Sequence, residues 1–125
     1  MPKKVVPWRI VVVEDDDGLR AAIVRMLNAC GWRGRGFASA EQFLASSAMK
    51  NFDCLVLDIY LPGISGFDLL DQIKLVKPEV CAILITAQDD IQISNRAANA
   101  GAFYLHKPFS GDALAAAVRE RMNAV

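Results

Sequence analysis

The sequence has one histidine and three cysteines among its 125 residues, and its formal charges cancel. The cysteines Cys30, Cys54 and Cys81 are odd in number and form no Cys-x-x-Cys pair. Because Cys54 and Cys81 lie in apolar stretches, we expect reduced, buried structural thiols and neither a disulfide nor a thiolate metal site. With His106 as the only histidine, any metal site must rest on oxygen ligands.

Three further absences limit the functions open to the chain. A net charge of 0 and a pI of about 6.6 give no electrostatic reason for direct binding to nucleic acid or to a membrane surface. No apolar run reaches the roughly 20 residues that a membrane-spanning helix needs. The N-terminus has no apolar signal core, and we therefore expect the chain in the cytoplasm.

The apolar content is sufficient for one compact domain. Hydrophobic residues make up 54% of the chain, which is too many for a disordered segment. The length fits a single domain, so we expect one unit over residues 1–125, in which residues 1–8 form an N-terminal extension.

Short apolar runs alternate with amphipathic segments along the whole chain. Continuous aliphatic runs predict strands covered on both faces, and apolar stripes at helical spacing predict helices. The expected strands are residues 9–13, 32–37, 53–58, 80–85 and 103–106. The expected helices are residues 18–29, a segment from Ser39, residues 67–76, residues 90–100, and a last helix from 110 or 111 to 122.

Five strand–helix units in this order predict an α/β fold. Strands joined through helices run parallel, and right-handed crossovers place helices on both faces of the sheet. The sequence therefore predicts a (βα)5 domain. In such a domain the ligand site lies beyond the carboxyl ends of the strands, near the switch in strand order.

Polar side chains follow four of the predicted strands, namely Glu14 and Asp15, Asp58, Thr86, and Lys107. Three carboxylates in one pocket repel one another, and a hard divalent cation resolves the conflict because Mg²⁺ takes oxygen ligands. Lys107 offers a positive charge for a phosphoryl oxygen, and Thr86 offers a hydroxyl. Asp58 can attack phosphorus and form an acyl phosphate.

Each of these residues also has an ordinary structural explanation. An acidic residue after a strand is often a helix N-cap, as we expect for Asp16 or Asp17, and a Lys-Pro pair is usually a turn. Their occurrence at successive strand ends of one (βα)5 chain is what favours a phosphoryl-transfer site.

The segments VVVEDDDGLR, CLVLDIYLPGISGFDLL, ILITAQ, AGAF and YLHKPF together resemble the receiver domain of two-component response regulators, over residues 9–122. The resemblance implies a flavodoxin-like, doubly wound sheet of five parallel strands in the order 2-1-3-4-5. It is greatest to receivers that precede a helix-turn-helix output domain. We expect that DNA-binding domain to be missing here, so the chain is a single-domain regulator or a fragment of a longer one.

The resemblance also implies a metal site. Glu14 and Asp15 match the metal-binding acid pair, with Asp15 a direct ligand and Glu14 acting through water. Asp58 matches the phosphoacceptor and a further ligand, and Tyr60 would contribute its backbone carbonyl. The implied cofactor is Mg²⁺, for which Mn²⁺ could substitute. Tyr60 and Gln88 match positions whose side chains tune the lifetime of the phosphoryl group.

A conformational switch is implied by the same resemblance. Thr86 matches the switch hydroxyl, Lys107 the phosphoryl-binding lysine, and Tyr104 the switch aromatic. A cis bond is expected between Lys107 and Pro108. The segment before Lys107 is one residue shorter than in the family: alignment on YLHKP assigns the switch to Tyr104, whereas alignment on AGA assigns it to Leu105. We favour Tyr104.

The implied function is that of a phosphoacceptor. A sensor histidine kinase or a phosphotransfer protein would donate a phosphoryl group to Asp58. The face formed by the fourth helix, fifth strand and fifth helix would then change to control an output domain or partner. We expect no enzyme activity beyond the chain's own phosphorylation and dephosphorylation. Homodimerisation on phosphorylation is left open.

Three other classes of protein remain as alternatives. A phosphatase with an aspartyl nucleophile needs an acid two residues after the nucleophile, where this chain has Tyr60. A flavodoxin-like FMN binder needs a phosphate loop after the first strand, where EDDD repels phosphate. A phosphorylation-independent interaction module has no need of the complete set of acids, threonine and lysine.

Overall fold

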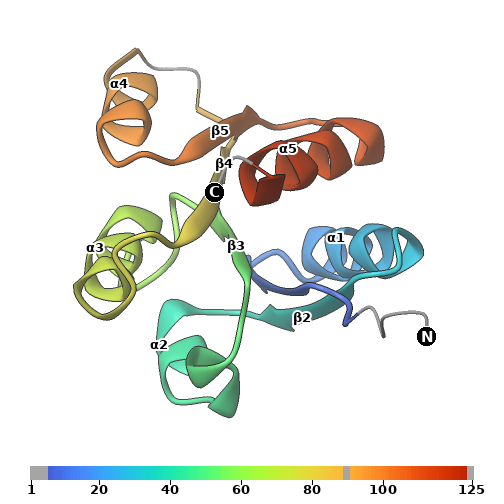
Figure 1. Ribbon diagram of the computed structural model, residues 1–125. Coiled ribbons are helices and arrows are strands. Elements are labelled where there is room, and N and C mark those ends of the chain that lie inside the picture. The colour runs from blue at the N-terminus through green and yellow to red at the C-terminus, as the bar shows by residue number, and fades with distance from the viewer. Residues whose placement is uncertain (1–5, 89–90, 124–125) are drawn as a thin grey trace.

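The computed structural model of the protein describes residues 6–88 and 91–123, and it forms one parallel sheet between two layers of helices (Figure 1). The strands are β1 (Arg9–Val13), β2 (Arg33–Phe37), β3 (Cys54–Asp58), β4 (Cys81–Thr86) and β5 (Phe103–His106). The helices are α1 (Asp17–Ala29), α2 (Ala40–Leu44), the 3-10 helix η1 (Ser47–Lys50), α3 (Gly66–Val76), α4 (Ile91–Asn99) and α5 (Gly111–Asn123).

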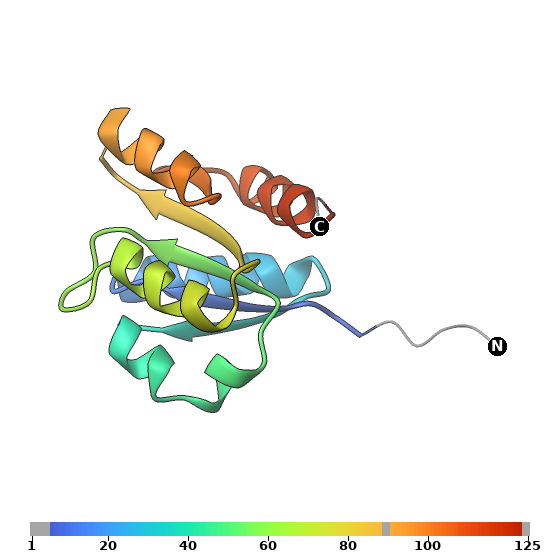
Figure 2. The same cartoon turned by 60° about the vertical axis from the view of Figure 1, so that its left-hand side comes forward.

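The sheet has the order β2-β1-β3-β4-β5, and every pair of neighbouring strands is parallel. The predicted fold class and strand order are therefore confirmed. The strand arrows that are visible in Figure 2 point the same way. The carboxyl ends of the strands consequently gather at one edge of the sheet, where the sequence predicts a site.

Side chains alternate between the two faces of the buried strands, as the period of two residues requires. Val11 and Val13 of β1 pack into the core under α2, α3 and α4, which contains Phe43, Leu70 and Ile93. The neighbouring Ile10 and Val12 pack into the core under α1 and α5, with residues such as Ile23, Leu27, Leu114 and Val118. Figure 1 shows α1 and α5 together on one side of the sheet. Burial on both faces explains why the central strands read as continuous apolar runs.

Most predicted elements differ from the observed ones by one or two residues. β3 begins at Cys54 rather than at residue 53; Asp53 still contacts β1, because its carboxylate accepts a hydrogen bond from the backbone N–H of Arg9 at 2.7 Å. β4 covers Cys81–Thr86 rather than residues 80–85, and β2 begins at Arg33 rather than at residue 32. Residue 90, the predicted start of α4, lies outside the described residues.

Helix starts follow capping residues. Asp16, one of the two predicted caps, accepts a hydrogen bond from the N–H of Leu19 at 2.9 Å, and α1 begins one residue later. Ser65 likewise caps α3 by accepting from the N–H of Asp68 at 3.1 Å, so α3 begins at Gly66, one residue before the prediction. In the described part of the chain, no helix is both long enough and apolar enough to cross a membrane.

Candidate functional site

The four predicted strand-end positions lie together at the carboxyl edge of the sheet. Glu14 follows β1, Asp58 and Thr86 are the last residues of β3 and β4, and Lys107 follows β5. Glu14, Asp58 and Thr86 are 1%, 5% and 0% exposed. Among residues 6–88 and 91–123, these are the three buried polar or charged residues. Since burying polar groups is costly without partners, this edge needs compensating contacts.

Lys107 supplies those contacts to both buried acids. Its Nζ atom lies 2.6 Å from Oε1 of Glu14 and 3.3 Å from Oδ2 of Asp58. The backbone N–H of Lys107 donates to the carbonyl of Thr86 at 2.7 Å, and the bond between Lys107 and Pro108 is cis, as predicted. Lys107 is therefore fixed by main-chain and side-chain contacts at the point where β1, β3 and β4 end.

Three carboxylates form a compact acidic cluster. Glu14, Asp15 and Asp58 each offer a carboxylate oxygen, and these atoms all lie within 4.8 Å of one another. Asp15 is exposed, so the cluster is open to solvent on one side. The donor set of closely spaced oxygens fits a hard divalent cation that keeps some of its water, as Mg²⁺ does.

Burial and the neighbouring charges shift the pKa values of Glu14 and Lys107 in this cluster. Burial raises the pKa of Glu14 to about 7; the hydrogen bond from Lys107 opposes this increase, and the neighbouring Asp58 adds to it. Burial alone would lower the pKa of Lys107, but its hydrogen bond with Glu14 and the charge of Asp58 outweigh burial and raise it. Without a bound cation, the pocket therefore favours a proton on Glu14 near neutral pH.

The two predicted switch residues are connected through Gln88. Oγ1 of Thr86 accepts a hydrogen bond from the backbone N–H of Gln88 at 3.0 Å. The hydroxyl of Tyr104 donates to the backbone carbonyl of Gln88 at 2.8 Å. The sequence placed Gln88 beside the site, but it could not reveal these contacts because they belong to its main chain.

Tyr60 lies at the rim of the site, with 55% of its surface exposed. Its backbone N–H donates to Oδ1 of Asp58 at 3.1 Å, which fixes one oxygen of that carboxylate. The role of its backbone carbonyl as a metal ligand stays a prediction.

Gly66, at the start of α3, is a residue whose importance the sequence reading missed. A Cβ atom added there would lie 2.4 Å from the carbonyl oxygen of Asp58, so only glycine lets the helix approach the end of β3 this closely. The signal available in the sequence was a glycine placed eight residues after a strand-end aspartate.

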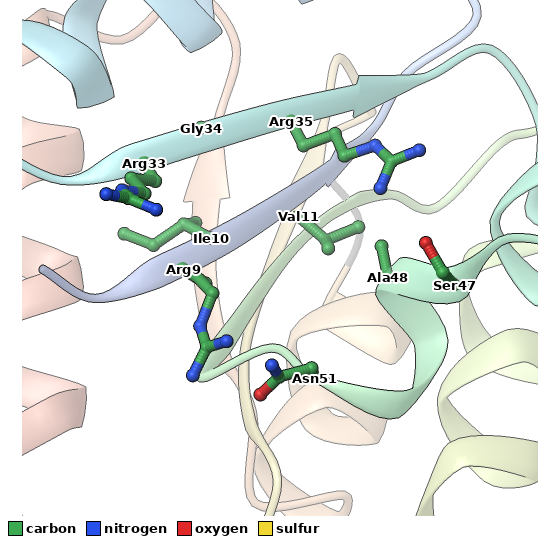
Figure 3. Close-up of a pocket in the computed structure, with 9 residues that line it drawn as sticks. All are labelled: Arg9, Ile10, Val11, Arg33, Gly34, Arg35, Ser47, Ala48 and Asn51. Carbon is green, nitrogen blue, oxygen red and sulfur yellow. The ribbon is translucent and has the colours of Figure 1, made fainter. Parts of the chain in front are cut away.

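A hollow of about 490 Å³ lies away from this site, between β1, β2 and η1, and Arg9, Arg33 and Arg35 line part of it. Figure 3 shows the three guanidinium groups at separate places rather than converging on one point. Arg9 also lies 3.9 Å from the carboxylate of Asp53. This hollow lacks the concentrated donors of an anion site.

Comparison with known proteins identifies the class to which this fold and pocket belong. The family model described as "Response regulator receiver domain" matches residues 10–119. The chain therefore belongs to the response regulator receiver domain family, which confirms the resemblance inferred from its motifs.

Two curated relatives are regulators of transcription by name. The chain is 37% identical over 113 residues to the DNA-binding transcriptional regulator NtrC of Salmonella typhimurium, and the match covers 90% of this chain and 24% of NtrC. It is 33% identical over 109 residues to the transcriptional regulatory protein FixJ of Azorhizobium caulinodans, covering 86% of this chain and 52% of FixJ. The chain thus spans between about a quarter and about half of the length of these relatives.

Solved structures agree in fold. The BeF3-activated DrrB receiver domain superposes with a TM-score of 0.86 at 32% identity, covering 94% of this chain and 99% of that one. A CheY-like receiver domain protein from Methanospirillum hungatei also gives a TM-score of 0.86, at 27% identity, covering 95% and 96%.

Proposed function

We propose that Asp58 accepts a phosphoryl group from a phosphohistidine on a sensor histidine kinase or phosphotransfer protein. One observation carries the proposal: the buried carboxylate of Asp58 lies 3.3 Å from Nζ of Lys107, within an acidic cluster that is open to solvent. Membership of the receiver family supports it. The chain thus acts as a signalling domain, with no chemistry beyond gain and loss of its own phosphoryl group.

The proposed transfer is a direct displacement at phosphorus. An oxygen of Asp58 attacks, the new O–P bond forms, and the P–N bond to histidine breaks as the imidazole leaves and takes up a proton. Nζ of Lys107 turns from Glu14 toward a phosphoryl oxygen, whose developing charge it stabilises. The hydrogen bond from the N–H of Tyr60 keeps the Asp58 carboxylate oriented for attack.

Glu14, Asp15 and Asp58 would hold Mg²⁺, or Mn²⁺ in its place, together with the backbone carbonyl of Tyr60. Asp15 binds directly in this proposal and Glu14 binds through water. The bound cation supplies positive charge that offsets the repulsion between the carboxylates and the incoming phosphoryl oxygens. The neighbouring Asp58 and Asp15 add to the rise in the pKa of Glu14 that burial causes, and this part of the rise supports the assignment because a cation would offset it.

Phosphorylation then changes the contacts of Gln88. The Thr86 hydroxyl, which now accepts from the N–H of Gln88, turns to donate to a phosphoryl oxygen. The hydrogen bond from the Tyr104 hydroxyl to the Gln88 carbonyl breaks when that carbonyl moves, and the Tyr104 ring fills the space that Thr86 leaves. The surface of α4, β5 and α5 changes as a result. A change of charge at Asp58 thereby alters a surface away from the site.

The output in this proposal is control of transcription through a DNA-binding domain or partner outside this chain. The names of the NtrC and FixJ relatives support this idea. Homodimerisation would use either the α4–β5–α5 face or the α1–α5 face. Location in the cytoplasm stays a prediction from the sequence.

The decisive experiment uses acetyl phosphate as phosphodonor and intact-mass spectrometry as readout. We expect one acid-labile phosphoryl group on the wild-type chain in the presence of Mg²⁺ and none after chelation. Asp58→Asn should abolish the adduct, whereas Asp71→Asn, at an exposed position of α3, should not. Continuous hydrolysis of acetyl phosphate with no accumulated adduct would instead indicate the phosphatase alternative. An equal adduct on Asp58→Asn would assign the acceptor to another residue.

A further inference from the structure

Two buried cysteines lie side by side on neighbouring strands. Cys54 and Cys81 are the first residues of β3 and β4, and the parallel register pairs them directly. Both belong to the core under α1 and α5, and their Sγ atoms are 2.9 Å apart. Neighbouring strands lie about 4.8 Å apart, within the Cα separation of about 4.4–6.8 Å that a disulfide bridges. The backbone therefore already has the spacing that a bond between these sulfurs requires.

The two thiols differ in access and environment. Cys81 is 5% exposed and Cys54 is fully buried. Of the two residues, Cys81 thus keeps a slight solvent exposure that Cys54 lacks.

The contact with Cys54 and two nearby positive groups favour a thiolate at Cys81. Nε of Arg121 is buried and finds no hydrogen-bond partner among residues 6–88 and 91–123. The hydrogen bond between Cys54 and Cys81 lowers the pKa of the Cys81 thiol; burial opposes this decrease, and the charges of Arg121 and Lys77 add to it. The same hydrogen bond, together with burial, raises the pKa of Cys54. Because Cys81 also keeps a slight solvent exposure, it is the sulfur of the pair better placed to attack.

We propose that Cys54 and Cys81 form a redox modification site that a small hydroperoxide oxidises to an intrachain disulfide. The Cys81 thiolate attacks an oxygen of the peroxide, so an S–O bond forms, the O–O bond breaks, and the released hydroxide takes up a proton. The sulfur of Cys54 then attacks the oxidised sulfur of Cys81. An S–S bond forms, the S–O bond breaks, and hydroxide leaves with the Cys54 proton as water.

The overall reaction is balanced. Two thiols and one molecule of hydrogen peroxide give one disulfide and two molecules of water; each sulfur loses one electron, and the peroxide gains two. The bond would join β3 to β4, the strands that end at Asp58 and Thr86. Cys30, which is free and half-buried at the end of α1, serves as an internal control.

The test treats the fully reduced chain with hydrogen peroxide and maps the product by mass spectrometry without reduction. Trypsin cleaves after Lys50, Lys74 and Arg96, so Cys54 and Cys81 fall in separate peptides. We expect the chain to lose two hydrogen atoms, the two peptides to become linked, and dithiothreitol to reverse both changes. Cys30→Ser should behave in the same way.

The cysteine variants separate an internal disulfide from general oxidation. Cys54→Ala and Cys81→Ala should form no intrachain link, and Cys54→Ala should instead collect oxygen atoms on Cys81. The proposal is overturned if the wild-type chain gains only oxygen atoms, or if its disulfides always include Cys30. Because the wild-type chain alone decides between these outcomes, poor folding of an alanine variant does not affect the test.

Discussion

Nζ of Lys107 lies 2.6 Å from Oε1 of Glu14, although the two residues are 93 positions apart in the chain. This contact joins the end of β1 to the end of β5 across the site. It also means that the ammonium group of Lys107, which we propose contacts a phosphoryl oxygen after phosphorylation, contacts the Glu14 carboxylate in the unmodified protein.

Replacing Lys107 should slow phosphorylation and destabilise the fold. Lys107→Ala leaves the buried carboxylates of Glu14 and Asp58 without their cation, and we expect phosphoryl uptake to fall on the order of a hundredfold, as for loss of other charge-stabilising donors. The rate can be followed by intact mass with acetyl phosphate. Lys50→Ala, an exposed lysine of η1, is the matched control. An unchanged rate in Lys107→Ala would contradict the assigned role.

Metal-free stability should fall as the pH rises. The pKa of Glu14 is raised from 4.5 to about 7, so between these values the folded chain binds more protons than the unfolded chain, and the free energy of unfolding decreases with pH. The expected loss is about 3 kcal/mol at most. It can be measured by urea denaturation in chelator at about pH 5 and about pH 8.

Two controls isolate the contribution of Glu14. Glu14→Gln should flatten the pH dependence over this window, because the amide does not titrate. Addition of Mg²⁺ should restore stability at the higher pH, since a ligand that binds only the folded state stabilises it. The assignment fails if wild type and Glu14→Gln show the same slope.

The switch contacts should be separable from phosphorylation itself. Thr86→Val removes the acceptor for the N–H of Gln88 but leaves the Asp58 pocket in place, so we expect the phosphoryl adduct without the change in α4 and β5. Hydrogen exchange of those elements, with and without acetyl phosphate, measures the difference. Tyr104→Phe, which removes the hydrogen bond to the Gln88 carbonyl but keeps the ring, should weaken the response less. Equal exchange changes in all three proteins would argue against a route through Gln88.

Gly66→Ala should destabilise the chain by about 1–3 kcal/mol, as overpacking typically does. The added Cβ would meet the carbonyl oxygen of Asp58 at 2.4 Å. Gly18→Ala is the matched control because it also lies in the first turn of a helix, where the nearest atom is 3.5 Å from the new Cβ. Alanine favours helix by up to about 1 kcal/mol, so this control should be neutral or stabilising. Chemical denaturation of both variants compares them, and similar stabilities would contradict the prediction.

The sequence predicted the framework because buried parallel strands and capped helices leave local signals. The run from Arg9 to Val13 and the cap at Asp16 could be read directly. The convergence of the strand-end residues followed from topology, since parallel strands end at one edge.

Features that depend on register or on main-chain contacts could not be read in this way. Cys54 and Cys81 each appeared as an ordinary buried thiol, and only the pairing of β3 with β4 brings their sulfurs together. The helix expected from Ser39 has only five residues before the chain continues into η1. Such details are decided by packing across the sheet rather than by neighbours in sequence.

The two hydrogen bonds of Gln88 use its peptide groups and leave its side chain out. Substitutions at this position can therefore alter how the rim of the site meets water while the connection between Thr86 and Tyr104 persists. Proline is the exception, because it has no N–H to donate. A comparison of side chains at position 88 among relatives of this chain would therefore not reveal the contact between Thr86 and Tyr104, because that contact runs through the main chain.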